Sequence, residues 1–172
     1  KLKRWFDCAE KFNIECFHTI DADDPFFDGS EMIESLELLK SQNCDVVSPT
    51  ESSSAGGASV GYSLTRDIIK KALYGVDDDA DTEMMWYYLE KIESINMKIL
   101  PDTRNTDLSI RLTLDYEEDY WLLSTVARIL GDNDSRDAVD QLFIKNPDLR
   151  KINLFRNDQW KQLQMDKKKK VK

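Results

Sequence analysis

The sequence predicts an α/β protein in which helices flank a mostly parallel sheet. Two observations favour this class. Short segments rich in β-branched and aromatic residues alternate along the chain with longer segments of helical periodicity, which is the order typical of strand–helix–strand units. In addition, the first and last predicted strands lead directly into aspartates, at residues 21 and 115. Polar groups that bind ligands commonly follow the carboxyl ends of parallel strands.

Five short segments are predicted to be strands because apolar, β-branched and aromatic residues dominate them. They comprise residues 14–20, 44–48, 59–64, 97–100 and 109–114. The segment 49–57 is rich in serine and glycine, so we expect a loop there. A long loop in a compact domain is usually functional or mobile, which makes this segment a candidate ligand-binding region.

Six segments are predicted to be helices from apolar residues at helical spacing. They cover approximately residues 2–12, 28–39, 65–74, 82–92, 117–129 and 135–144. Asp28 and Thr65 have the side chains and positions expected of N-caps. Pro147 stops the last helix, and we expect the remainder to be a polar tail whose lysine-rich end, residues 167–172, is a frayed, solvated terminus.

Composition excludes several classes of function. The chain has 172 residues, with 24 basic and 33 acidic side chains and a net charge of -9. Such an acidic chain repels a phosphate backbone, so we expect no nucleic-acid binding. No run of 18 apolar residues predicts a membrane span, and three cysteines without a C-x-x-C pair predict neither a disulfide framework nor a zinc site. We expect a cytoplasmic protein that does not bind membranes, and homo-oligomerisation remains an open alternative.

The aspartates after the first and last predicted strands are the strongest candidates for chemistry. Carboxylates from two neighbouring strands can converge on one magnesium ion, which typically binds one or two carboxylates together with substrate phosphates. Two structural alternatives remain open. Asp115 has Glu118 three residues later, the pattern of a capped helix, and Asp24 precedes a proline and could form an Asx-turn.

Other motifs carry less information. The glycine-rich segment 55–61 lacks the fingerprints of the known nucleotide loops. It is compatible either with a flexible turn or with a loop whose backbone approaches a ligand. His18, the one histidine, alternates with Ile14, Cys16 and Ile20 on one strand face and is interpreted as a core residue.

Two segments resemble signatures of the sugar-activating cytidylyltransferases. Residues 19–28 read T-I-D-A-D-D-P-F-F-D and resemble that family's strand followed by A-D-x-P or G-D-x-P. Residues 111–119 read R-L-T-L-D-Y-E-E-D and resemble its R-[LV]-T-[LV]-D-x-P-E-D motif, the more specific of the two. The family includes acylneuraminate and 3-deoxy-manno-octulosonate cytidylyltransferases and the SpsF-like spore-coat polysaccharide proteins. Residues 146–153 resemble the carboxyl-terminal extension of the SpsF-like branch.

The resemblance implies a Rossmann-like fold of the nucleotide-diphospho-sugar transferase type and a role in polysaccharide biosynthesis. It implies transfer of CMP from CTP to a sugar or sugar acid, with release of pyrophosphate. Asp23 and Asp115 match the family's two magnesium-holding aspartates and are the expected catalytic residues. Arg111 belongs to the second motif and is a candidate substrate-binding residue. Ser59 and Tyr62 are candidate sugar contacts, because the loop before them offers hydroxyl groups and a flexible backbone.

Two departures from the family limit this interpretation. Glu117 stands where the family usually has proline, and the family's amino-terminal loop L-x-x-R-x-x-S-x-R-[LI]-x-x-K is absent. We therefore expect residues 1–132 to be the carboxyl-terminal part of a nucleotidyltransferase domain and residues 133–172 to be a helical extension with a basic tail. Alone, this part is expected to be inactive. The alternatives are a nucleotidyltransferase of the same fold with another nucleotide or acceptor, and a non-catalytic binding or assembly module.

Overall fold

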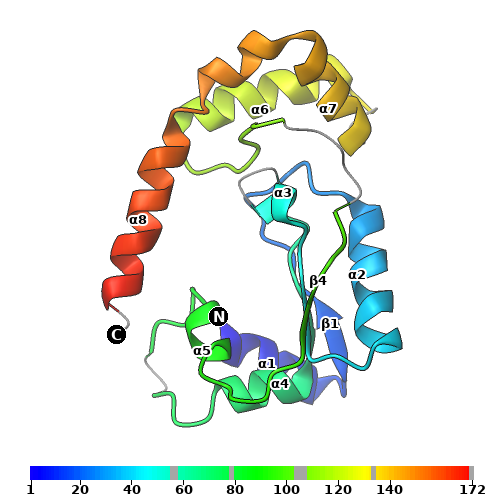
Figure 1. Cartoon of the computed structure of the whole chain (residues 1–172), viewed down its shortest axis with the longest axis vertical. Coiled ribbons are helices and arrows are strands. Elements are labelled where there is room, and N and C mark those ends of the chain that lie inside the picture. Colours follow the sequence, from blue (N-terminus) through cyan, green and yellow to red (C-terminus); the bar gives the residue numbers. More distant parts are fainter. Residues whose placement is uncertain (55–57, 78–79, 103–107, 133–134, 171–172) are drawn as a thin grey trace. The chain divides into compact units, whose positions relative to one another are not determined.

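The chain divides into two compact units, each assembled from separate stretches of sequence. The computed structural model describes residues 1–54, 58–77, 80–102, 108–132 and 135–170 (Figure 1). The first unit, here called the sheet unit, comprises residues 1–19, 32–48 and 61–100. The second, here called the helical unit, comprises residues 20–31, 49–60 and 101–172. The domain boundary expected between residues 132 and 133 stays a prediction.

The sheet unit contains a four-stranded sheet with the strand order β1-β3-β2-β4. Its strands are β1 (Cys16–His18), β2 (Val46–Ser48), β3 (Ser63–Thr65) and β4 (Met97–Ile99). β2 and β4 pair in parallel, whereas β3 is antiparallel to both β1 and β2. The mixed α/β class is confirmed, and the expectation of a mostly parallel sheet is wrong for the two pairings of β3.

The direction of β3 follows from the path of the chain. After β2 the chain leaves the sheet unit at residue 48 and returns at residue 61. Val47 is paired with Ser63, so the chain re-enters the sheet beside the point where it left, and β3 must run backwards. Gly61 makes this return possible. Its φ is +86°, and a Cβ at this position would lie 1.8 Å from the Thr19 carbonyl oxygen.

β4 forms one edge of the sheet, and its side chains are exposed. Among the described strands it pairs with β2 alone. The exposed fractions of Met97 and Ile99 are 41% and 57%, so two apolar residues stand in solvent on either side of Lys98. An exposed edge of this kind offers unpaired backbone groups to other strands.

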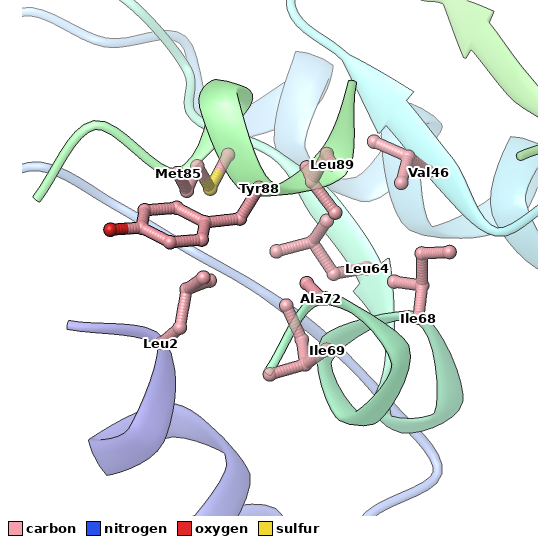
Figure 2. Packing of buried hydrophobic residues seen from close by; sticks show 9 residues of the cluster. All are labelled: Leu2, Val46, Leu64, Ile68, Ile69, Ala72, Met85, Tyr88 and Leu89. Carbon is pink, nitrogen blue, oxygen red and sulfur yellow. The ribbon is translucent and has the colours of Figure 1, made fainter. Parts of the chain in front are cut away.

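One apolar core joins the sheet to three helices, α1 (Leu2–Lys11), α4 (Arg66–Ala72) and α5 (Trp86–Leu89). A further helix, α2 (Gly29–Ser41), meets β3 through a hydrogen bond of 2.8 Å between the Ser35 and Ser63 hydroxyl groups. Figure 2 shows Leu2 of α1 and Ile69 of α4 on one side of the cluster and Leu89 of α5 on the other, with Leu64 of β3 between them. Thr65 caps α4 by accepting a hydrogen bond from the Ile68 N–H at 3.3 Å, as predicted.

The helix expected over residues 82–92 is much shorter in the structure. Only Trp86–Leu89 is helical. The preceding residues use their polar groups differently: the Thr82 hydroxyl oxygen accepts the Leu2 N–H at 3.1 Å, and the Asp81 carboxylate accepts the Glu83 N–H at 2.9 Å. These bonds favour a turn over an additional helical turn.

The helical unit contains the two longest predicted helices of the carboxyl-terminal half. Its elements are α3 (Glu51–Ser54), α6 (Glu117–Leu130), α7 (Arg136–Lys145), a 3₁₀ helix (Pro147–Ile152) and α8 (Arg156–Lys170). α6 and α7 confirm the predictions for residues 117–129 and 135–144. The segment expected to be a polar tail contains a further helix over residues 156–170. No helix among the described residues has both the length and the apolar character needed to cross a membrane.

The strand expected over residues 109–114 is also wrong. Residues 109–114 have no regular secondary structure and belong to no sheet of the described chain. Ile110, Arg111 and Leu112 are all buried, so the segment does not present one buried and one exposed face. Its backbone binds other partners: the Leu114 N–H donates to the Asp23 carbonyl at 2.8 Å, and the Arg111 carbonyl accepts from the Asn153 side chain.

Candidate functional site

The core of the helical unit brings the candidate segments together. Phe26, Ala58, Ile110 and Leu112 pack in one apolar cluster with side chains of α6 and α7. Each of these four residues lies within a few positions of a candidate site residue. The apolar cluster therefore fixes the acidic turn at residues 21–24, the segment that ends at Ser59, and the 111–115 motif relative to one another.

The two predicted magnesium ligands lie on adjacent segments. The hydrogen bond from the Leu114 N–H to the Asp23 carbonyl, 2.8 Å long, joins the residue before Asp115 directly to Asp23. Asp23 is exposed, and the Asp115 side chain retains 31% exposure. Both carboxylates are therefore accessible to a cation from solvent.

Asp24, which sequence reasoning assigned no chemical role, lies at the centre of this arrangement. Its exposed fraction is 8%, and its carboxyl group accepts hydrogen bonds from the Thr113 hydroxyl and the Ser59 backbone N–H. Burial, and secondly the charge of Asp23, raises the pKa of Asp24 from 3.8 to about 7. The sequence signal for Asp24 is its place in the acidic run before Pro25, a pattern that is equally typical of an Asx-turn.

Arg111 forms a buried ion-pair cluster with two aspartates. Its Nε and Nη2 atoms donate to the two carboxylate oxygens of Asp119, each at 2.9 Å. Nη2 also donates to Asp115 Oδ2 at 2.7 Å. This bidentate arrangement is geometrically specific and stronger than hydrogen bonds between neutral groups. The guanidinium is fully buried among these partners, and its expected role in substrate binding stays a prediction.

Asp119 organises the start of α6. Burial by itself would raise the pKa of Asp119, but hydrogen bonds from Arg111, from the Asp115 backbone and from Asn153 lower the pKa overall. Asp119 Oδ2 also accepts the Tyr116 N–H at 3.0 Å and so caps the helix. The alternative in which Asp115 caps this helix together with Glu118 is therefore wrong.

Glu118 instead pairs with a residue of α8. Arg156 donates to its two carboxylate oxygens at 2.7 and 3.0 Å, and this hydrogen bonding lowers the pKa of Glu118. The guanidinium groups of Arg111 and Arg156 both approach the ring of Tyr116, and their carbon atoms are 5.2 and 4.9 Å from the ring centroid. Residues of α8 and of the second motif thus form one cluster.

The donor set fits a magnesium ion that is held partly by substrate. Among the described residues, no three His, Cys, Asp or Glu side chains gather closely enough to form a complete metal site. Asp23 and Asp115 supply two hard oxygen donors, the number that magnesium takes when phosphates complete its shell. The magnesium assignment stays a prediction.

The two candidate sugar contacts have different settings. Ser59 lies beside Asp24, to which its backbone N–H donates. Tyr62 belongs to the sheet unit, where its ring lies 4.2 Å from the ring of Trp86. Both roles stay predictions, and residues 55–57 of the serine- and glycine-rich loop lie outside the described residues.

A hollow of about 600 Å³ in the sheet unit is lined by basic side chains, unlike the acidic candidate site. Lys70, Lys71 and Lys91 line it together with Tyr74 and Tyr88. Lys70 and Lys71 lie in the last turn of α4, where the helix dipole favours cationic side chains. The helix end therefore accounts for the position of two of the three lysines.

Comparison with known proteins identifies the fold. The structure superposes on a solved cytidylyltransferase from Leptospira borgpetersenii serovar Hardjo-bovis (strain JB197) with a TM-score of 0.72 and 21% sequence identity. The chain shares this fold. The match covers 87% of this chain and 64% of the cytidylyltransferase chain, so the present chain spans less than two thirds of its neighbour. No protein-family model matches the chain, and no curated protein sequence matches it.

Proposed function

We propose that this chain is part of a magnesium-dependent nucleotidyltransferase that transfers CMP from CTP to a sugar or sugar acid and releases pyrophosphate. The observation that carries the proposal is the hydrogen bond between Leu114 and Asp23, which places the two motif aspartates on adjacent segments. The fold shared with a cytidylyltransferase supports the same reaction class.

Each site residue has a distinct part in this proposal. Asp23 and Asp115 hold the magnesium ion, which when bound neutralises triphosphate charge and orients the α-phosphorus for in-line attack. Arg111 keeps the Asp115 carboxylate in place through the 2.7 Å ion pair. The acceptor hydroxyl forms the new bond to the α-phosphorus as the bond to pyrophosphate breaks, and the hydroxyl proton passes to solvent, so little covalent chemistry falls to the protein.

The acceptor sugar is proposed to bind beside residues 51–62. Ser59 adjoins Asp24 in the helical unit, and the hydroxyl groups of this segment suit a polyhydroxylated ligand. Ser59 is the proposed contact in the helical unit, and the role of Tyr62 in the sheet unit stays a prediction. Hydrogen exchange of residues 51–62 should slow when the correct sugar is added to protein that already holds magnesium and a CTP analogue.

The test is pyrophosphate release from CTP with magnesium and a panel of sugar acids. It uses the protein together with any sequence that precedes Lys1 in its natural coding region. Replacing Asp23 with Asn removes one ligand charge and should lower the rate on the order of 100-fold or more. Asp28→Asn is the matched control, because Asp28 caps α2 through the Ser30 N–H and asparagine caps equally well.

Near-normal turnover of the Asp23→Asn variant would refute the magnesium assignment. If pyrophosphate is released from another nucleoside triphosphate but not from CTP, that nucleotide and not CTP is the substrate. Absence of release from every triphosphate would favour a non-catalytic module of the same fold.

A further inference from the structure

Asn153 occupies an unusual position at the end of the 3₁₀ helix. Its side chain is fully buried, and its Nδ2 donates both to the Arg111 carbonyl at 3.0 Å and to Asp119 Oδ1 at 2.9 Å. Both neighbours are acceptors, so the amide must present its nitrogen to them. Its Oδ1 is buried without a hydrogen-bond partner in the described part of the chain.

The unpartnered oxygen shows that the Asn153 amide lowers the stability of the folded state. A buried polar atom without a partner destabilises the folded state, whereas an apolar side chain of similar size would avoid that penalty. What the asparagine provides in return is its pair of donated bonds. Those bonds reach the backbone and the counter-ion of a single residue, Arg111.

A short chain of contacts leads from Asn153 to the proposed metal ligand. Asn153 holds Asp119, Asp119 binds the Arg111 guanidinium through two oxygens, and the guanidinium binds Asp115. Asn157 of α8 closes the remaining side, because its Oδ1 accepts from Arg111 Nη1 at 3.2 Å. Two asparagines from the carboxyl-terminal segment thus fix the group that orients the Asp115 carboxylate.

We propose that Asn153 is a positioning residue for Asp115, and that the segment from the 3₁₀ helix into α8 thereby sets the affinity of the site for a divalent cation. The inference rests on the magnesium assignment within the proposed function. Residues that orient a metal ligand typically change metal affinity by 10–100-fold when they are replaced. The segment is therefore an integral part of the cation site.

The test measures the 172-residue chain with Mn²⁺ as the probe. Paramagnetic broadening of the Leu114 and Asp115 amide signals reports the dissociation constant, and hydrogen exchange of the Arg111 Nε–H reports the order of the guanidinium without metal. Asn153→Ala should speed that exchange and raise the Mn²⁺ dissociation constant about 10-fold. Lys151→Ala is the matched control, since Lys151 lies in the same 3₁₀ helix and pairs with exposed Asp148 on the protein surface.

A second variant keeps the test interpretable if Asn153→Ala does not fold. Asn157→Ala removes one acceptor of Arg111 from a half-buried position and should shift both readouts in the same direction by a smaller factor. Unchanged Mn²⁺ affinity in both variants, or no Mn²⁺ broadening at residues 114 and 115 in the unaltered chain, would overturn the inference. If the affinity falls as expected while the protein that includes any sequence preceding Lys1 transfers no nucleotide, the positioning role stands and the proposed reaction fails.

Discussion

The acidic turn and the Arg111 cluster each bury one aspartate, but the pKa values of these two aspartates shift in opposite directions. Asp24 and Asp119 are both buried, with exposed fractions of 8% and 0%. Burial and neighbouring carboxylates raise the pKa of Asp24 to about 7, whereas the guanidinium and backbone donors around Asp119 overcome burial and lower its pKa. The comparison shows that the counter-charge supplied by the fold, and not burial alone, decides the charge state.

The difference in pKa separates carboxylates that form structural ion pairs from carboxylates that are available to bind a cation. In the Arg111 cluster the fold supplies the cation, so the charges stabilise the packing of α6 against the carboxyl-terminal segment. In the acidic turn, a cation that bound beside Asp23 would relieve repulsion between carboxylates. The Leu114–Asp23 hydrogen bond connects the two regions at the proposed metal site.

The largest effect is expected from removing the cation of the buried cluster. Arg111→Met leaves Asp119 buried without its counter-ion, which should lower the free energy of unfolding by about 3–5 kcal/mol. Urea unfolding at pH 7 measures this loss. Arg156→Met is the control, since its ion pair with Glu118 is partly exposed. Equal losses in the two variants would remove the distinction between a buried and a surface pair.

A smaller effect is expected at Asp24, and it depends on pH. Below pH 4 the carboxyl group is protonated in both the folded and unfolded states. Between pH 4 and 7 the unfolded chain loses a proton that the folded state keeps, so stability falls as pH rises. The unaltered chain should thus lose roughly 2–4 kcal/mol of unfolding free energy across this range, a loss that Asp24→Asn avoids.

Urea unfolding at pH 5.5 and pH 8 tests this prediction. The gain in stability of Asp24→Asn over the unaltered chain should be larger at pH 8. Glu37→Gln, which replaces an exposed acid on α2, should change stability little at either pH. An equal gain for Asp24→Asn at both pH values would show that the charge of Asp24 does not differ between the two states.

The smallest effect is expected at the surface pair of α8. Glu118→Gln weakens the two hydrogen bonds from Arg156, which hold a partly exposed ion pair. Solvent screens such pairs, so the urea midpoint should move less than in Arg111→Met, and the difference from the unaltered chain should shrink in 1 M NaCl. A midpoint shift that salt does not reduce would show that solvent does not screen this ion pair, as expected of a buried pair.

The sequence predicts the amphipathic elements well, because their burial follows their spacing. The helices over residues 117–129 and 135–144 are present since their apolar residues face one core. Residues 110–113 alternate between apolar and polar types, which predicts a strand. In the structure all four are buried, because Asp119 neutralises Arg111 and Asp24 accepts from Thr113, so the alternation does not separate two faces.

Features that depend on long-range contacts could not be predicted. α8 lacks apolar periodicity, and its first turn is anchored by Arg156 and Asn157 to residues about 40 positions earlier. β3 is antiparallel because the chain returns at Gly61, which local sequence does not indicate. Of the candidate site, Asp23, Asp115, Ser59 and Arg111 lie in one unit. The resemblance selected Asp23 and Asp115, whereas the central place of Asp24 depends on its distant partner Thr113.

The exposed edge of β4 also determines how the protein should be handled. Met97 and Ile99 stand in solvent at this edge of the sheet, and Lys98 between them is the charged residue of the strand. At pH 7 a net charge of -9 keeps molecules apart. Near pH 4.7 that repulsion vanishes, leaving Lys98 to oppose edge-to-edge pairing between copies. Concentrated samples should therefore precipitate as they approach that pH, and a lysine or proline at Ile99 should delay the onset.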